Sequence, residues 1–258
     1  MAADSAPSIA TLAGPFEALV AYDWGADAAP FKEIDAAVIA AHADANLRAE
    51  VEKRLSAVLG PGTSRAAKEY ACRKLCMIGT VASVPALAAL LGDAEHSHMA
   101  RFALERIPAA EAAAALRAAL GTVSGDLKIG MISSLGSRGD AESVPLLKPL
   151  LPAGGAAPSA EGVAVARAAA EALGMIATPA AAEALATVSP LAAGPVGAAA
   201  VDARLACAES FLRHGKAPEA LAIYQALATA AAGTPTARRI ELAATRGLLA
   251  CADSASAS

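Results

Sequence analysis

The chain has 258 residues, of which 56% are hydrophobic, 3% aromatic and 18% charged, and its formal net charge is −4. The low charge and the high apolar content exclude a wholly disordered chain. The acidic balance argues against a nucleic-acid binder held mainly by bulk charge. Alanine supplies 76 residues. With few aromatic residues, the core must be built from Ala, Leu, Val and Ile, which favours closely packed helices over a β-sandwich.

The N-terminal part of the chain differs from the rest. Residues 1–14 are small or polar, and we expect them to be disordered. Residues 15–60 are expected to form N-terminal capping helices, the first of which runs from Pro15 towards Gly25. Trp24, the only tryptophan, lies in this cap. Tyr22 and Trp24 either cover the open end of the first helix pair or form an aromatic contact site.

A proline that opens an apolar helix recurs along the chain. The five instances are Pro85, Pro108, Pro145, Pro179 and Pro218. Proline suits the first helical turn because its missing N–H is unpaired there and its φ is already helical. Each proline is followed by about a dozen helix-forming residues and preceded by another helical pattern. Three glycines stand where the first helix of a pair should stop, and they are Gly79, Gly136 and Gly174.

The repeating unit is therefore helix, short turn, helix, and it predicts an all-α fold of the α-solenoid type. One such pair cannot bury its apolar face, whereas about three or more stacked pairs can. We expect a right-handed superhelix of about six to seven antiparallel helix pairs in one continuous domain. Alanine fits this architecture because it has the best helix propensity and lets neighbouring helices approach closely.

Four segments carry a resemblance to a known family. They are Tyr22–Gly25, Cys72–Leu87, Ser97–Pro108 and Ile132–Asp140. The repeats resemble HEAT repeats, and the chain as a whole is similar to the HEAT-repeat proteins common in planctomycetes and verrucomicrobia. The segment Gly215–Ala228 is similar to a TPR-type helix pair.

The resemblance implies HEAT-like repeats over residues 61–190 and TPR-like C-terminal helix pairs over 191–252. It also implies a scaffold or binding protein, often exported to the periplasm and often part of a larger chain. The tail, residues 253–258, has a linker-like composition and is expected to be flexible. From this composition we expect either a truncation or the edge of a longer protein.

Three further segments bear on processing and topology. The start, Met1–Pro7, lacks the basic and apolar regions of a signal peptide, yet resembles the small-residue start of a processed, exported protein. Residues 152–160 are expected to be a flexible connector. The uncharged stretch 184–201 is interrupted by proline and glycine, which favours a loop between two helices over a membrane span.

Metal-ligating residues are sparse. Cys72 and Cys76 share one helix face, either as small core residues or as half of a metal site that no nearby His or Cys cluster completes. HEAT-type metalloenzymes resemble one another in repeated His-Glu pairs that bind iron, but none of the four histidines here is followed by Glu. His96 and His98 point to different sides of a helix. We expect His96 to help start that helix and His98 to pack at a repeat junction, with no metal and no cofactor.

Catalytic motifs are equally sparse. The chain has no GxxxxGK[ST], GxGxxG, GxSxG or HExxH motif. The segment Ser134–Gly139 lacks the strand–turn–helix context of a nucleophile elbow and is expected to be a helix end. We therefore expect a protein that is not an enzyme and that binds a protein partner. The alternative is a HEAT-type enzyme, or a cofactor-handling or nucleic-acid-binding subunit that uses an arginine-lined face.

Basic residues recur on the first helices of successive pairs. They are Arg65, Lys68, Arg73, Lys74, Arg101, Arg106, Lys128, Arg138 and Arg167. Stacking could align them into a ridge that holds an acidic partner or a phosphate. Alternatively they form a solvated face with interleaved acids, where each ion pair contributes about 0–1 kcal/mol, or an arginine bridges to the carbonyls that end a neighbouring helix. The candidate binding residues are Trp24, Arg73, Lys74, His98, Arg101 and Arg138.

Overall fold

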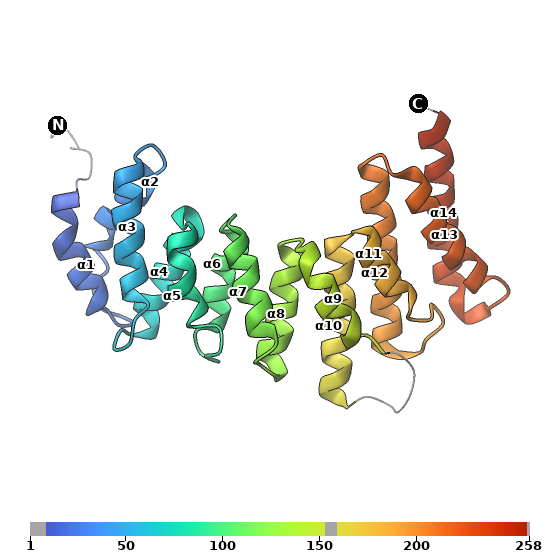
Figure 1. Cartoon of the computed structure of the whole chain (residues 1–258), viewed down its shortest axis with the longest axis horizontal. Coiled ribbons are helices and arrows are strands. Elements are labelled where there is room, and N and C mark those ends of the chain that lie inside the picture. Colours follow the sequence, from blue (N-terminus) through green and yellow to red (C-terminus); the bar gives the residue numbers. More distant parts are fainter. Residues whose placement is uncertain (1–8, 153–158, 257–258) are drawn as a thin grey trace. The chain divides into compact units, whose positions relative to one another are not determined.

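The structure, a computed structural model, describes residues 9–152 and 159–256, and all regular structure in these ranges is helical (Figure 1). The chain divides into two compact units, Met1–Val123 and Ser124–Ser258. The N-terminal unit contains α1 (Ala13–Val20), α2 (Phe31–Ala40), α3 (Ala45–Val58), α4 (Arg65–Ile78), α5 (Val84–Ala88), α6 (Ser97–Arg106) and α7 (Ala110–Leu120). The C-terminal unit contains α8 (Gly125–Ser137), α9 (Val144–Leu147), α10 (Ala160–Ile176), α11 (Pro179–Ala186), α12 (Gly194–Arg213), α13 (Ala217–Ala231) and α14 (Arg238–Ser256).

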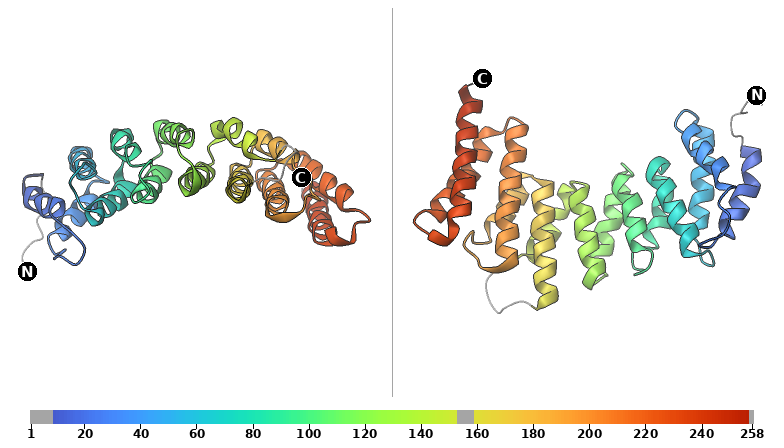
Figure 2. Two further views of the ribbon diagram at one scale, coloured as in Figure 1. Left: turned by 90° about the horizontal axis from the view of Figure 1, so that it is seen from below. Right: turned by 180° about the vertical axis from the view of Figure 1, so that it is seen from behind.

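The helices of each unit lie in two layers (Figure 2). In the N-terminal unit, α4 packs between α2 and α6 in one layer, and α5 packs between α3 and α7 in the other. In the C-terminal unit, α8, α10, α12 and α14 lie side by side, and α9 and α11 belong to the second layer. This stacking of helix pairs confirms the predicted all-α, α-solenoid fold.

Four of the five recurring prolines stand at helix starts as predicted, whereas Pro108 lies two residues before α7. Pro85, Pro145, Pro179 and Pro218 occupy the first two positions of α5, α9, α11 and α13. Three of these helices are shorter than the expected dozen residues, since α5 has five residues, α9 has four and α11 has eight. In α9 the cause is Pro149, which cannot donate the helical hydrogen bond, so the chain tightens into a 3₁₀ turn.

Two of the three glycines that were expected to end helices lie inside helices instead. Gly79 does end α4, but Gly136 and Gly174 lie inside α8 and α10. A Cβ atom added at Gly174 would lie 2.8 Å from the Cα of Ala203 in α12. These glycines therefore allow neighbouring helices to approach closely. The stop of α10 comes at Ala177, which adopts a left-handed conformation with a φ of 48°.

A polar clamp on α3 fixes the end of α4. The Arg48 guanidinium donates from Nε to the carbonyl of Ile78 at 2.7 Å. Glu52, which is only 3% exposed, accepts hydrogen bonds from the backbone N–H of Thr80 at 2.6 Å and from its hydroxyl at 2.9 Å. The role predicted for a junction arginine, bridging to the carbonyls that end a neighbouring helix, is thus filled by Arg48.

The ends of the chain are more ordered than the sequence predicted. Residues 9–12 form a 3₁₀ helix that runs into α1, so the prediction of disorder over 1–14 is wrong for 9–14. The reason is Leu12, which is fully buried and holds this turn on the core. At the other end, α14 continues to Ser256, since alanine and serine do not break a helix. Residues 1–8, 153–158 and 257–258 lie outside the described residues, together with the expectations that fall on them.

The uncharged stretch 184–201 divides as expected. It holds the end of α11, a loop and the start of α12. Within the described part of the chain, no helix is long and apolar enough to cross a membrane.

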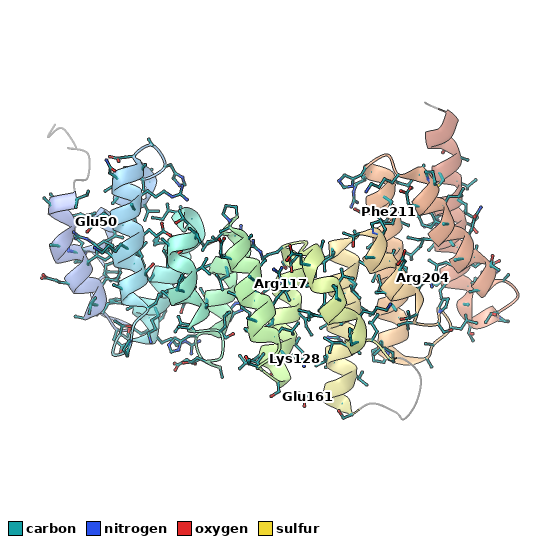
Figure 3. All side chains as sticks on the ribbon, in the orientation of Figure 1. Glu50, Arg117, Lys128, Glu161, Arg204 and Phe211 are labelled. Atoms are coloured by element: carbon teal, nitrogen blue, oxygen red, sulfur yellow. The ribbon has the colours of Figure 1, made fainter. Side chains whose placement is uncertain are left out.

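The buried clamp gives a first test. We expect Glu52→Ala to lower the free energy of unfolding by about 1–3 kcal/mol, because the N–H and hydroxyl of Thr80 lose their buried acceptor. The matched control is Glu50→Ala on the same helix, where the carboxylate pairs with Arg54 near the surface (Figure 3). Chemical denaturation measures both variants. Equal losses in the two would contradict the clamp.

The close contact of α10 and α12 gives a second test. We expect Gly174→Val to destabilise the chain by at least about 1–3 kcal/mol, because the new side chain collides with the backbone of Ala203. In Ala198→Val, an exposed position of α12, the only cost is the weaker helix propensity of valine. The two thermal unfolding midpoints separate these cases, and a Gly174→Val midpoint no lower than that of Ala198→Val would disprove the tight packing.

Candidate functional site

A small pocket in the N-terminal unit gathers half of the chain's aromatic residues. It has a volume of about 220 Å³ and lies between the α1–α2 loop, α2 and α4. We refer to it as the N-terminal pocket. Its aromatic lining residues, four of the eight in the sequence, are Tyr22, Trp24, Phe31 and Tyr70.

The α1–α2 loop carries two of these aromatic side chains. The carbonyl of Tyr22 accepts a hydrogen bond from the Ser64 hydroxyl at 2.6 Å, which ties the loop to the start of α4. The Asp23 carboxylate accepts from the backbone N–H of Trp24 at 2.8 Å, and Gly25 supplies a φ of 88° that only glycine adopts freely. This turn leaves the Trp24 side chain 86% exposed. Trp24 therefore does not cover the end of the first helix pair, as one of the two predicted roles required.

The remaining aromatic rings form a packed row. The ring centroids of Tyr22 and Phe31 are 4.8 Å apart in an edge-to-face arrangement, and those of Phe31 and Tyr70 are 4.9 Å apart. The Lys74 ammonium lies 4.9 Å from the Tyr70 ring centroid. Such ring pairs contribute about 0.5–1.5 kcal/mol beyond the burial of their area. The walls of the pocket are therefore fixed before any ligand arrives.

Asp35 of α2 is the polar centre of this row. Its Oδ1 accepts a hydrogen bond from the Tyr70 hydroxyl at 2.6 Å and pairs with the Lys74 ammonium at 2.7 Å. Burial raises the pKa of Asp35, but the hydrogen bonds from Lys74 and Tyr70 and the charge of Lys74 outweigh it, so the pKa is below its ordinary value. Burial, the hydrogen bond to Asp35 and its charge together raise the pKa of Tyr70.

Charged residues form the rim of the N-terminal pocket. Glu69 and Arg73, one helical turn apart on α4, pair at 3.3 Å, and both side chains are partly exposed. Lys32 also lines the pocket, is exposed, and has no ion-pair partner among the described residues. The four charged lining residues sum to zero, and the Lys74 ammonium on Asp35 adds one positive charge beside them.

The structure brings together three of the six candidate binding residues. Trp24 and Arg73 line the pocket, and Lys74 lies at its wall on Asp35. His98 is exposed in the first turn of α6, and Arg101 is half-buried on the same helix; neither lines the pocket. Burial lowers the pKa of Arg101, and the charge of Glu105 opposes this.

Arg138 belongs to the C-terminal unit, at the end of α8. A ridge of arginines that runs through both units stays a prediction. The alternative prediction was a solvated face on which basic residues pair with interleaved acids. Two such ion pairs form, between Arg73 and Glu69 and, at 3.4 Å, between Arg167 and Glu171.

The histidine and cysteine expectations have mixed outcomes. His96 occupies the N-cap position of α6, but its side chain makes no capping hydrogen bond, and its Nδ1 lies 2.9 Å from the Asp93 carboxylate. Cys72 is buried, and burial together with the nearby charge of Glu69 raises the pKa of its thiol to about 12. In the described ranges, no group of three or more His, Cys, Asp or Glu side chains is placed to hold a metal ion.

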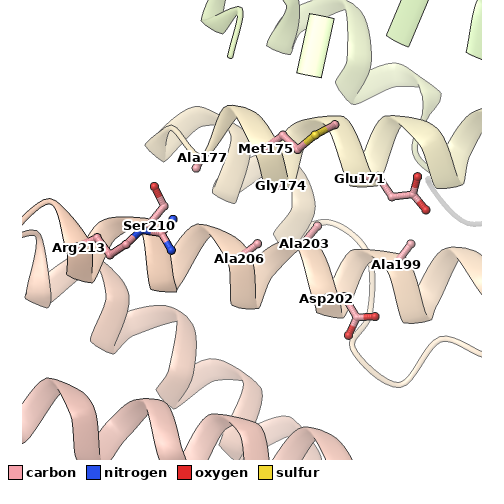
Figure 4. A pocket seen from close by; sticks show the side chains of 10 residues that line it. All are labelled: Glu171, Gly174, Met175, Ala177, Ala199, Asp202, Ala203, Ala206, Ser210 and Arg213. Atoms are coloured by element: carbon pink, nitrogen blue, oxygen red, sulfur yellow. The ribbon is translucent and has the colours of Figure 1, made fainter. Parts of the chain in front are cut away.

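A larger but more open groove lies in the C-terminal unit between α10 and α12 (Figure 4). It has a volume of about 400 Å³ and a floor of small residues such as Gly174, Ala203 and Ala206. Glu171 is at one end and Arg213 at the other. The groove has no aromatic wall. For this reason we regard the N-terminal pocket as the better candidate site.

The chain was compared with known proteins and families. Residues 165–188, which comprise most of α10 and all of α11, match the family model described as PBS lyase HEAT-like repeat. This segment is a HEAT-like repeat. HEAT-like repeats generally serve as protein-interaction scaffolds, because stacked repeats present a long binding surface. None of the curated proteins matches the chain.

Sequence reasoning missed four residues of the site. They are Phe31, Lys32, Asp35 and Tyr70. Part of the signal is visible in the sequence, since Phe31 and Asp35, like Tyr70 and Lys74, are one helical turn apart. Local patterns do not contain the pairing of α2 with α4, in which the contacting residues Asp35 and Tyr70 are 35 positions apart.

The coupled Asp35 predicts a pH dependence. At neutral pH we expect Asp35→Asn to lower the unfolding midpoint, because the amide cannot pair with Lys74 as a charge. The folded pKa of Asp35 is below its unfolded value of about 3.9. The stabilisation is therefore present above about pH 4 and is lost as the pH falls through the folded pKa.

Thermal unfolding from neutral to acidic pH measures this effect. The midpoints of the wild type and Asp35→Asn should converge in acid. Glu33→Gln, an exposed change on the same helix, should match the wild type at neutral pH. A difference for Asp35→Asn that persists unchanged into acid would refute the Asp35–Lys74 contribution.

Proposed function

We propose that this chain is a non-catalytic repeat scaffold that holds a protein partner in the N-terminal pocket. The observation that carries the proposal is Trp24, whose side chain is 86% exposed beside a pocket with fixed aromatic walls. Tryptophan is among the residues most enriched at the energetic centres of protein interfaces. An exposed tryptophan in a chain with so few aromatic residues therefore points to a contact.

The size and lining of the pocket support a protein ligand. A volume of about 220 Å³ is below the roughly 300–1,000 Å³ of ordinary small-molecule sites. It suits one large side chain of a partner. The apolar centre with a charged rim of Lys32, Glu69 and Arg73 is also the usual anatomy of a protein interface.

The repeat architecture supports the same function. The HEAT-like repeat at 165–188 belongs to a class of repeats that generally acts in protein interaction. The similarity of Gly215–Ala228 to a TPR-type pair, and of the chain to planctomycete HEAT-repeat proteins, would fit a scaffold as well. An exported location, which the resemblance implies, is part of the same proposal.

One observation favours the alternative function. The family description matched by residues 165–188 contains the word lyase. A HEAT-type enzyme, or a subunit that handles a cofactor or nucleic acid with an arginine-lined face, would use residues such as Arg101, Arg138 and Arg167. The experiment below therefore includes a nuclease treatment, which removes a partner held through nucleic acid.

A cross-linking capture tests the scaffold function. The baits are the wild type, Trp24→Ala and Leu249→Ala, a control that removes an exposed apolar side chain of α14 in the C-terminal unit. We expect a defined protein to be captured by the wild type and by Leu249→Ala. Loss of an interface tryptophan costs about 2 kcal/mol or more, roughly a thirty-fold loss of affinity. Trp24→Ala should therefore lose the partner.

Circular dichroism first checks that each variant is folded. Nuclease-treated lysate and periplasm of the source organism are then analysed by quantitative mass spectrometry. A partner captured equally by all three baits would count against the N-terminal pocket. A partner lost only after nuclease treatment would favour the alternative function.

A further inference from the structure

We infer that the N-terminal pocket recognises an acidic peptide segment of its partner, in which one large apolar side chain enters the pocket and a neighbouring carboxylate contacts Lys32 and Arg73. This inference rests on the proposed function and specifies the chemistry of the partner.

The apolar anchor follows from the floor of the pocket. Phe31 is only 5% exposed and lies between Tyr22 and Tyr70 in the packed row. The Tyr70 hydroxyl already donates to Asp35, so the groups at the floor have their polar partners within the chain. A side chain that enters here gains apolar contacts and removes none of these hydrogen bonds, which favours an aliphatic or aromatic residue over a polar one.

The carboxylate follows from the rim. Lys32 has no acidic partner among the described residues. Arg73 is held only by a surface pair with Glu69 at 3.3 Å, of the kind that contributes about 0–1 kcal/mol. An incoming carboxylate can therefore pair with Lys32, which has no other ion pair among the described residues, and with Arg73, whose pair with Glu69 is weak. The opposite charge of Asp35 is compensated by Lys74, which lies 2.7 Å away.

The same geometry disfavours a cationic ligand. Aromatic walls with nearby acids can hold an ammonium group over a ring face. Here, however, the chain itself places the Lys74 ammonium 4.9 Å from the Tyr70 ring centroid. A second cation would face the charges of Lys74 and Lys32 at close range. A lysine-containing partner segment is therefore the outcome that would contradict the inference.

Selection from a random peptide library tests the inference on the full chain. Displayed dodecapeptides are selected on the immobilised wild type and counter-selected on Trp24→Ala. We expect the enriched peptides to share a Leu, Phe, Met or Trp with an Asp or Glu within about one turn of it. Enriched peptides that depend on Trp24 but carry basic or neutral neighbours would overturn the inference and leave the proposed function intact.

If the library yields no Trp24-dependent peptide, the pocket is not a docking site. That result would contradict both the proposed scaffold function and the inference of an acidic peptide. The enriched peptides are then synthesised and titrated. For enriched peptides without tryptophan, Trp24 is the only tryptophan in the mixture, so its fluorescence reports binding at this site directly. Burial of the exposed indole should shift its emission to shorter wavelength.

Charge reversal provides the matched comparison. Lys32→Glu should weaken the selected peptides about ten-fold or more, and added salt should weaken wild-type binding in the same direction. Lys53→Glu, at an exposed lysine of α3 outside the pocket, changes the net charge by the same amount and should leave the affinity within about two-fold. Equal weakening by the two reversals would show that only overall charge matters and would overturn the carboxylate contact.

Discussion

The fold depends on how closely helices without large side chains can approach one another. In the C-terminal unit, Gly174 of α10 faces Ala203 of α12 with no space for a Cβ atom. Such contacts bury little apolar area per residue, and they leave the rotation and register of each helix weakly defined. Polar side chains at the turns fix the rotation and register of the helices. Glu52 and Arg48 hold the end of α4, and Glu161 of α10 accepts a hydrogen bond at 2.8 Å from the N–H of Gly125, at the start of α8 (Figure 3).

The N-terminal pocket is the exception to this alanine-based packing. Where α2 and α4 meet, the contact is made by the rings of Phe31 and Tyr70 and not by small residues. The space between them is closed from one side by the α1–α2 loop. An aromatic pocket with Trp24 beside it is therefore a local departure from the composition of the rest of the chain. This departure from the packing elsewhere is the feature on which the proposed binding role rests.

The sequence predicted the fold from proline spacing because proline acts locally, on its own turn. Four of the five prolines stand within the first two positions of a helix. Gly136 and Gly174 were wrongly predicted to end helices because their effect is not local. Gly136 and Gly174 act on a neighbouring helix that is remote in sequence, and a local pattern cannot distinguish that from a helix end. The site shows the same division. Trp24 and Arg73 were identified by residue type, whereas Phe31 and Asp35 required the contact between α2 and α4.

Ser64 joins the α1–α2 loop to the first turn of α4. Its hydroxyl oxygen caps α4 by accepting from the N–H of Ala67 at 3.0 Å, and the same hydroxyl donates to the carbonyl of Tyr22 at 2.6 Å. One atom thus serves both the first turn of α4 and the loop that carries Trp24. Fraying of that turn releases the loop, and a ligand that immobilises the loop protects the amides of the turn from solvent exchange. The loop that carries Trp24 and the first turn of α4 are thus coupled through one hydroxyl group.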